Sequence, residues 1–387
     1  MKSYKFRLKP SPRIVRIFEQ WLDVCRELYN AGLQERRDAW KINQISISYH
    51  AQAVQLPPIK AIREDFASLN AQVLQDTLRR LSKTFDAFFR RVKQGEKPGY
   101  PRFKSKYRFN SFTFPQTKGA FSIKGNRLYL SKIGHVKIIQ HRPIEGEIKT
   151  CTIKREADGW YAVFAVAENQ SRFLPKTGES AGIDVGIESF ATLSTGQQIE
   201  NPRFLRESAR RLKTAQRKVS RRRKGSNRRR LAVRLLRKQH QKVARQRVDF
   251  HHKTSLNIIR EFDAVVIEDL NISGLLKNHH LAKAIADVAW CAFFLILVSK
   301  AENAGRKVLK VAPQFTSQDC SQCGARVRKS LVVREHRCIA CGFVAHRDHN
   351  AAINIKNRGG TAIRDGSGCA PARTENLPGS DREAAAL

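Results

Sequence analysis

The chain lacks two features that would place it in a membrane or on a secretory route. No run of 18 or more apolar residues occurs in its 387 residues, so no transmembrane helix is expected. No apolar stretch follows the charged N-terminal residues 1–7, as a secretory signal would require. With 41% hydrophobic residues the chain can still bury the cores of two or three domains. We therefore expect a soluble cytoplasmic protein without a membrane partner.

Acidic residues are scarce relative to basic ones. Thirty-four Asp and Glu stand against 73 Lys and Arg, which gives a net charge of +39. A compact fold with this charge repels itself, and nucleic acid is the most abundant polyanion that compensates it. An anionic membrane surface is the alternative, but proteins that bind one usually carry an apolar anchor, and none is evident. The charge therefore predicts a nucleic-acid-binding protein.

The eight cysteines do not form the pattern of a disulfide framework. Four of them make two close pairs, Cys320 with Cys323 and Cys338 with Cys341, and a glycine follows each pair. Four thiolates at this spacing suit tetrahedral zinc, which is expected to be structural because no coordination position stays open. We expect a β-hairpin between the two pairs. Unrelated cysteines or a redox disulfide are the alternative interpretation.

The N-terminal part of the chain changes from a helical to a strand-like pattern. Residues 1–12 predict a short strand, and apolar residues three and four apart then predict amphipathic helices up to residue 95. From 100 to 172, short β-branched and aromatic stretches separated by Gly and Asn turns predict a small antiparallel barrel. We expect the first strand to join this barrel, so that the helices at 15–95 are an insertion.

Aromatic and basic residues alternate from Tyr100 to Phe114. The aromatic side chains either stack on bases or fill the core of the barrel, and the second is the more frequent fate of strand residues. The residues concerned are Tyr107, Phe109, Phe112 and Phe114, with Arg102, Lys104, Lys106 and Arg108 between them. We predict nucleic-acid contacts for Tyr100, Arg102 and Lys104.

Residues 203–247 hold 20 Lys or Arg and one acid, Glu207. Leucine and valine keep helical spacing on both sides of Gly225-Ser226-Asn227, which predicts a long basic helical hairpin. A solvated charged helix usually mixes both signs, so the single sign favours contacts with a phosphate backbone over a merely solvated face. The predicted contacts are Arg210, Arg211, Lys213, Arg217, Lys218, Arg221, Arg222, Arg223, Arg228, Arg229 and Arg230.

Beyond the hairpin the pattern becomes that of an α/β domain. The apolar run 264–268 predicts a strand buried on both faces of a parallel sheet. A long helix at 281–303, a strand at 307–311 and a short helix at 350–356 are expected to follow. The last 29 residues, 359–387, have no apolar period and predict a disordered tail. Two histidine pairs suggest no ligand set and are expected at the surface: His251-His252 and His279-His280.

Three acids, Asp184, Glu268 and Asp348, stand in apolar surroundings. An ionised carboxylate on a buried strand is costly unless something pairs with it. Three converging carboxylates repel one another unless cations hold them, and Mg²⁺ suits an all-oxygen site. Two such ions activate water and stabilise the leaving oxygen of a phosphodiester. Alternatively, Asp184 is the turn acid of an Ile-Asp-x-Gly loop, as in actin-like ATPases, and the other two acids cap helices.

Four motifs combine these residues in one order along the chain. They are Gly182-Ile183-Asp184-Val185-Gly186, Val266-Ile267-Glu268-Asp269-Leu270-Asn271, Thr316-Ser317-Gln318-x-Cys320-Ser321-x-Cys323-Gly324 and Asp348-x-Asn350-Ala351-Ala352-x-Asn354-Ile355. Together they resemble the TnpB (OrfB) family of transposon-encoded, RNA-guided DNA nucleases, which is similar in its catalytic half to type V CRISPR effectors. The resemblance is densest at 178–356 and weaker at residues 4–8 and 99–104.

The resemblance implies a multidomain α+β fold: a RuvC-like nuclease domain of RNase H fold with an inserted zinc ribbon, and an N-terminal oligonucleotide-binding-like β-barrel with an inserted helical recognition domain. The implied boundaries are 1–14 and 96–174 for the wedge-like barrel, 15–95 for the recognition domain, 175–314 and 345–358 for the nuclease domain, and 315–344 for the target-binding zinc ribbon. The tail at 359–387 follows.

The resemblance also implies a set of roles. Asp184, Glu268 and Asp348 are the expected catalytic ligands of Mg²⁺, the four cysteines hold Zn²⁺, and Arg334 matches an arginine that steadies phosphate charge, or is a plain surface residue. The implied partners are a guide RNA from the transposon end and double-stranded target DNA beside a short flanking motif. The family usually carries Asp two residues before its third acid, where this chain has His346.

The expected protein is thus a metal-dependent endodeoxyribonuclease, monomeric and associated with the nucleoid of a prokaryotic cytoplasm. The nearest alternative is an RNA-guided repressor that binds DNA without cutting it. A strand-transfer transposase is the second, although no helix-turn-helix signature is evident. An actin-like ATPase is the third, but it has no use for the charge of +39.

Overall fold

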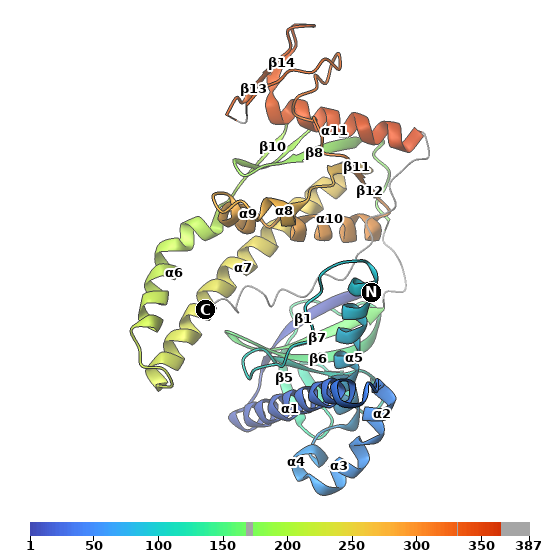
Figure 1. Ribbon diagram of the computed structural model, residues 1–387, viewed down its shortest axis with the longest axis vertical. Coiled ribbons are helices and arrows are strands. Elements are labelled where there is room, and N and C mark those ends of the chain that lie inside the picture. Colours follow the sequence, from blue (N-terminus) through green and yellow to red (C-terminus); the bar gives the residue numbers. More distant parts are fainter. Residues whose placement is uncertain (168–172, 331, 365–387) are drawn as a thin grey trace. The chain divides into compact units, whose positions relative to one another are not determined.

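The computed structural model describes residues 1–167, 173–330 and 332–364. The chain divides into two compact units, Met1–Gln170 and Ser171–Leu387. Each unit has its own hydrophobic core, so each is a folded body in itself (Figure 1).

The sheet of the first unit has seven antiparallel strands in the order β2-β6-β7-β1-β5-β4-β3. The strands are β1 (Lys2–Lys9), β2 (Ser111–Phe114), β3 (Phe121–Lys124), β4 (Arg127–Leu130), β5 (Gly134–Ile139), β6 (Glu147–Glu156) and β7 (Gly159–Ala167). β1 pairs with both β5 and β7, which confirms that the N-terminal strand joins this sheet. Its buried residues alternate, Tyr4, Phe6 and Leu8, as expected for a strand with one face in the core.

Five helices lie between β1 and β2 in the chain. They are α1 (Pro12–Asn43), α2 (Tyr49–Val54), α3 (Leu56–Ile62), α4 (Glu64–Ala67) and α5 (Ala71–Lys93). α1 begins after Ser11, whose Oγ accepts a hydrogen bond from the amide of Ile14, and Pro12 occupies its first turn. Phe18 and Trp21 of α1 pack against Phe112 of β2, with ring centroids 5.8 and 5.3 Å apart. The helices and the sheet therefore share one core.

The second unit is built on a five-stranded sheet of order β10-β9-β8-β11-β12. Its strands are β8 (Ser180–Val185), β9 (Ser189–Leu193), β10 (Gln198–Glu200), β11 (Ala264–Glu268) and β12 (Lys307–Val311). β8, β11 and β12 are parallel, as the apolar run of β11 predicts, and β9 and β10 are antiparallel. Helices α7 (Asn227–Glu261) and α10 (Trp290–Ala304) contribute to the core on one face, and α11 (Arg347–Arg364) covers the other (Figure 1).

The predicted basic hairpin is present. α6 (Phe204–Ser220) and the first part of α7 pack along a seam of five buried apolar residues, and the pair projects away from the sheet (Figure 1). The seam consists of Leu212, Val219, Ala232, Leu236 and Val243. α7 begins after Ser226, whose Oγ accepts from the amide of Arg229, so the predicted break at 225–227 is a helix cap.

The single helix predicted at 281–303 is wrong in one respect. The short α8 (Ile272–Leu275) comes first, and two helices then follow, α9 (Ala282–Val288) and α10, separated by Ala289 in the left-handed conformation with φ 54°. The break leaves the carbonyl of Val288 free to accept a hydrogen bond from His251. By length and composition Ala282–Ala304 could cross a membrane, but in this fold Ile285, Val288, Phe293 and Leu297 pack in the core of the second unit.

The helix predicted at 350–356 is longer than expected and includes the first residues of the predicted tail. α11 extends from Arg347 to Arg364, through Gly359 and Gly360. A Cβ on Gly359 would collide with the side chain of Val266 on β11. The glycine therefore permits close packing of helix on sheet instead of ending the helix. The remaining predicted tail, 365–387, lies outside the described residues.

Candidate functional site

The strand register places two of the three predicted acids side by side. β8 and β11 pair in parallel with Ile183 opposite Ile267, so the residues that follow, Asp184 and Glu268, occupy neighbouring positions at the carboxyl ends of the strands. In-register residues of parallel strands point to the same face of a sheet. That face is covered by α11, whose first turn carries Asp348.

Glycine lets α11 approach this face closely. A Cβ on Gly182 would collide with the carbonyl oxygen of Ala352 and the amide nitrogen of Lys356, both in the backbone of α11. Gly182 lies two residues before Asp184 on the same face of β8, and Ala352 lies one helical turn after Asp348. The backbone contact therefore brings the two acids towards each other.

The electrostatics show that the three acids interact. The pKa of Asp184 is raised well above its ordinary value, first by enclosure of its carboxyl group and then by repulsion from Glu268 and Asp348. Burial also raises the pKa of Glu268, against a lowering effect of its hydrogen bond with Thr316. A cation would relieve this repulsion, and an all-oxygen donor set suits a hard divalent ion. The three carboxylates therefore form an electrostatically coupled cluster of the donor type that Mg²⁺ prefers, whereas among the described residues only the cysteines bring their donor atoms within 4.8 Å of one another.

Neighbouring residues hold Asp348 in place. Nε of Arg347 lies 3.1 Å from Oδ1 of Asp348, and its charge also acts against the raised pKa of Asp184. His346, where the family usually carries Asp, accepts a hydrogen bond at Nδ1 from the amide of Asp348, at 3.3 Å. An aspartate there would accept the same bond, so His346 takes over a capping contact at the start of α11.

The four predicted cysteines come together in the structure. Their Sγ atoms all lie within 4.8 Å of one another, and in the part of the chain that the structure describes they are the group of this kind that fits a metal. Sγ of Cys320 is 3.7 Å from that of Cys341, and Cys323 is 3.6 Å from Cys338. A tetrahedron with metal–sulfur bonds of about 2.3 Å has edges of about 3.8 Å. The cluster therefore fits a structural metal.

Backbone amides favour the thiolate form of Cys338, whereas its cysteine neighbours raise the pKa of Cys341. N–H groups of Cys341 and Ala340 lower the pKa of the Cys338 thiol to about 7, and thiolate is the form that binds metal. The hairpin predicted between the two pairs lies elsewhere: β13 (Glu335–Arg337) and β14 (Val344–His346) enclose the second pair. Each pair sits in its own tight turn, with the amides of Gly324 and Gly342 bonded back to Cys320 and Cys338.

A ladder of side chains on α11 fixes the first cysteine turn to the helix that carries Asp348. The amide of Asn350 donates to the carbonyl of Asp319 at 2.8 Å and accepts from the amide of Ser321 at 2.9 Å. Asn354 donates to the carbonyls of Thr316 and Asp319 at 2.8 and 2.7 Å. Arg358 adds bonds to Ala312, Gln314 and Asp319. We call these three residues, at i, i+4 and i+8, the anchoring ladder.

The same turn reaches the acids directly. Oγ1 of Thr316 donates to Oε1 of Glu268 at 2.6 Å, and both side chains are buried. From the sequence, Thr316, Asn350 and Asn354 stand only within motifs, without a role, and Arg358 is not singled out. The signal that could have found them is the helical spacing of Asn350, Asn354 and Arg358, which places all three on one face of α11.

Arg334 lies near the start of α11. Its carbonyl accepts from the amide of Arg347, and its guanidinium pairs with Glu188 at 2.7 Å. Glu188 follows β8 four residues after Asp184. The backbone of Arg334 is therefore bonded to the residue that precedes Asp348, while its side chain pairs with Glu188.

The predicted hairpin contacts are exposed, with one exception. Arg229 is half-buried and donates to the carbonyls of Val219 and Arg222, at 2.7 and 3.2 Å. It therefore joins the two helices at the tip of the hairpin, which gives it a structural task. The predicted contacts Tyr100, Arg102 and Lys104 belong to the other unit.

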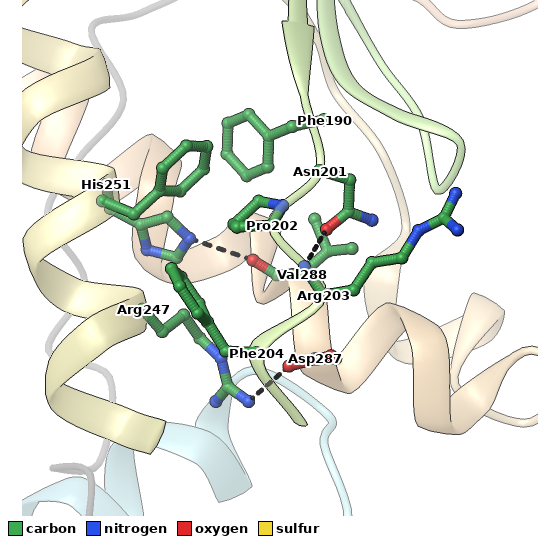
Figure 2. A pocket seen from close by; sticks show the side chains of 10 residues that line it. Phe190, Asn201, Pro202, Arg203, Phe204, Arg247, His251, Asp287 and Val288 are labelled. Carbon is green, nitrogen blue, oxygen red and sulfur yellow. Dashed lines mark hydrogen bonds and ion pairs between the residues drawn. The ribbon is translucent and has the colours of Figure 1, made fainter. Parts of the chain in front are cut away.

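The base of the hairpin contains polar residues that the sequence analysis missed (Figure 2). Arg247 of α7 pairs with Asp287 of α9 at 3.1 Å, and Asp287 accepts from the amide of Leu205 in the first turn of α6. One carboxylate thus ties both arms of the hairpin to α9. A negative charge at a helix N-terminus is also favourable.

The predicted surface position of His251 is wrong. His251 is 1% exposed and packs among Phe190, Phe250 and Phe293. Its Nε2 donates to the carbonyl of Val288 at 3.0 Å, the contact made possible by the break at Ala289 (Figure 2). Burial lowers the pKa of His251 to about 4. His279 and His280 are exposed as predicted.

Acid should destabilise the protein through His251. Between pH 6.5 and 4 the unfolded state binds a proton that the folded state does not, so the free energy of unfolding falls as the pH falls. The contribution is about 3 kcal/mol at most, since one pKa unit is about 1.4 kcal/mol. Melting temperatures at several pH values should therefore fall less steeply for His251→Gln than for the wild type. The exposed control His280→Gln should keep the wild-type slope, and equal slopes for all three proteins would contradict the prediction.

The aromatic residues of 100–114 divide between the two predicted fates. Phe109, Phe112 and Phe114 are buried in the core, whereas Tyr100 and Tyr107 are 44% and 60% exposed. Packing against α1 accounts for the division, since Phe109, Phe112 and Phe114 each contact an aromatic ring of that helix.

Comparison with known proteins identifies the family. The OrfB IS605 family, described as "Probable transposase", matches residues 164–279, and "Cas12f1-like, TNB domain" matches residues 290–355. A "Putative RNA-guided DNA endonuclease" of Streptomyces pristinaespiralis is 35% identical over 385 residues, 98% of this chain and 94% of the relative. The chain belongs to the TnpB (OrfB) family. A second TnpB-family relative, the "Putative RNA-guided DNA endonuclease InsQ" of Escherichia coli (strain K12), is 26% identical over 95% of this chain and 94% of its own length.

The structural comparison bears on the fold. The solved structure of the mini-RNA-guided endonuclease CRISPR-Cas phi3 superposes with a TM-score of 0.50 at 10% identity and covers 92% of each chain. The two proteins thus share a multidomain α+β fold. A family described as "Helix-turn-helix domain" matches residues 1–44, but here these residues form the strand β1 and the single helix α1.

Proposed function

We propose that this TnpB-family protein is a transposon-encoded, RNA-guided DNA endonuclease with one metal-dependent active site. The observation that supports the proposal is the electrostatic coupling of Asp184 with Glu268 and Asp348, where the first turn of α11 meets the ends of β8 and β11, in a chain of this family. A guide RNA from the transposon end pairs with the target, and the protein reads a short flanking motif and the shape of the duplex.

In this proposal Asp184, Glu268 and Asp348 hold Mg²⁺, which when bound activates water and stabilises the leaving oxygen of a phosphodiester. Asp184 retains its proton to higher pH than a free aspartate does, so it is neutral more often until a cation is present. Thr316 orients the carboxylate of Glu268, and Arg347 offsets the charge of Asp348. Arg334 contacts phosphate once the nucleic acid displaces Glu188.

The remaining assignments follow from the same proposal. Residues 175–314 and 345–358 form a RuvC-like domain of RNase H fold, and 315–344 form a zinc ribbon that contacts the target. Residues 1–14 and 96–174 form an oligonucleotide-binding-like barrel. The exposed cations of the hairpin hold a phosphate backbone through salt-sensitive contacts. The protein acts as a monomer at the nucleoid, in the cytoplasm, where its DNA substrate lies.

The test is cleavage of a plasmid library by the protein co-expressed with RNA from the end of its element. Each plasmid carries a matched target beside randomised flanking bases. Loss of plasmids with one flanking motif, only when the guide matches and Asp184 is intact, is the expected result. If RNA co-purifies and matched DNA is bound without any loss, the protein is a guided repressor instead. Neither binding nor cutting would favour a strand-transfer transposase.

A further inference from the structure

Aromatic side chains are unusually exposed where α5 ends and the following loop returns to α1. Phe89, Tyr100 and Phe103 are 54%, 44% and 44% exposed. The ring of Tyr100 stands edge-on to Phe85 and Phe88, with centroids 5.8 and 5.6 Å apart. Phe89 also packs against Phe85 and Phe88, with centroids 6.2 and 5.2 Å apart, so the rings of Tyr100 and Phe89 rest on an aromatic base. We call Phe89, Tyr100 and Phe103 the aromatic platform.

The loop that carries two of these rings is fastened to α1. The side chain of Asn30 donates to the carbonyl of Lys104 at 3.0 Å and accepts from its amide at 2.8 Å. Pro101 is buried. The guanidinium of Arg37 lies over the ring of Phe103, 5.3 Å from its centroid. Fixed rings lose little conformational entropy when a ligand stacks on them.

The surroundings of the platform are strongly basic. Residues 83–108 include nine Lys or Arg and two acids, Asp86 and Glu96. Arg90, Lys93 and Arg102 are exposed, and within the described ranges none of them forms an ion pair with an acidic residue. An apolar peptide could cover the rings but would leave these cations uncompensated. A polyanion with flat aromatic groups satisfies both features.

We propose that the aromatic platform binds single-stranded polynucleotide by stacking on its unpaired bases, while the surrounding cations contact its phosphates. Bases offer their faces to side chains only where they are unpaired, whereas a duplex hides them within its own stack. This inference deepens the proposed function by naming a strand-binding site in the first unit. It requires a nucleic-acid partner but no cleavage.

Binding of labelled single-stranded oligonucleotides to the full-length protein, in EDTA, tests the site. Tyr100→Ala and Phe103→Ala should each weaken binding at least about fivefold, because stacking on an aromatic side chain contributes about 1–3 kcal/mol per base. Tyr100→Phe should keep the wild-type affinity. The matched control is Ile62→Ala, since Ile62 is 83% exposed in the same unit without being aromatic. Unchanged affinity of both alanine variants, or an equal loss for a duplex of the same length, would overturn the proposal.

A second measurement needs no variant. Oligonucleotides carrying 5-iodouracil should photocrosslink the wild-type protein within residues 89–103, and the crosslinked peptide can be sequenced by mass spectrometry. Crosslinks confined to the second unit would contradict the site. RNA and DNA oligonucleotides are compared in both experiments, so a larger effect with one of them names the strand that is bound. Stacking in a protein that fails to cut plasmids would support this site while refuting the endonuclease.

Discussion

Replacing Glu268 by Gln is expected to abolish DNA cleavage, with a loss of about a thousandfold or more. The charge that neutralises the proposed cation disappears, whereas the shape of the side chain and an acceptor for Thr316 remain. Metal-ion catalysis lowers the activation barrier by several kcal/mol, and each 1.4 kcal/mol changes the rate by a factor of about ten. Guided cleavage of a matched plasmid measures the effect, and a gel shift checks that RNA and DNA binding persist.

The chain offers a matched control next to Glu268. Asp269 is also acidic, but its side chain is 65% exposed and pairs with Lys310 at 3.0 Å. Asp269→Asn removes the same charge one residue away and should leave cleavage within about twofold of the wild type, as an exposed ion pair contributes little. Cleavage at the wild-type rate by Glu268→Gln would move the active site away from this carboxylate. Loss of RNA binding would show that Glu268 is structural.

Replacing Cys320 by Ser is expected to remove the metal from the cysteine cluster and to unfold its surroundings. A structural Zn²⁺ contributes about 10–16 kcal/mol of binding free energy in small zinc-binding peptides, so loss of a ligand is severe. Elemental analysis should find about one zinc per wild-type chain and much less in the variant. Limited proteolysis should cut the variant within residues 315–346 and spare the rest of the second unit.

Cys291→Ser is the control for this experiment. Cys291 is exposed and lies outside the cluster, on α10. It should keep both the zinc content and the proteolytic pattern of the wild type. If Cys320→Ser retains zinc and resists protease to the same extent, the four cysteines do not form a metal site. A different metal bound at full occupancy would keep the structural role and change only its identity.

The chemistry-bearing residues were predictable because their constraints are local. An ionised carboxylate such as Asp184 on an apolar strand costs free energy unless a cation or another partner compensates it. Two cysteines in a Cys-x-x-Cys turn are typical metal ligands, so residue type and spacing indicate both sites. The period of apolar residues likewise predicted the hairpin and the strand β11. The shared family motif then supplied the order in which the acids meet.

The contacts between distant segments were not predictable, because the residues next to each contact in the sequence do not indicate which distant segment it will meet. Gly359 was predicted to begin a disordered tail, but it lies within α11, where it lets the helix pass Val266. His251 was predicted at the surface because it suggested no ligand set, but its partner, the carbonyl of Val288, is available because α9 ends there. Phe103 and Phe112 are the same residue type in the same stretch, and only the packing of α1 and α5 separates them.

The anchoring ladder makes the cysteine module a rigid part of the second unit. The cysteine module is bonded to α11 through Asn350, Asn354 and Arg358, and its other end runs directly into α11 at Arg347. α11 in turn is clamped to the sheet at Gly182 and Gly359. The module therefore cannot rotate away from the sheet without displacing α11, and with it Asp348. If both strands of a target are to reach one active site, the strands must therefore be brought to it, and the basic hairpin, which is bonded to α9 at its base, is the element that we expect to move.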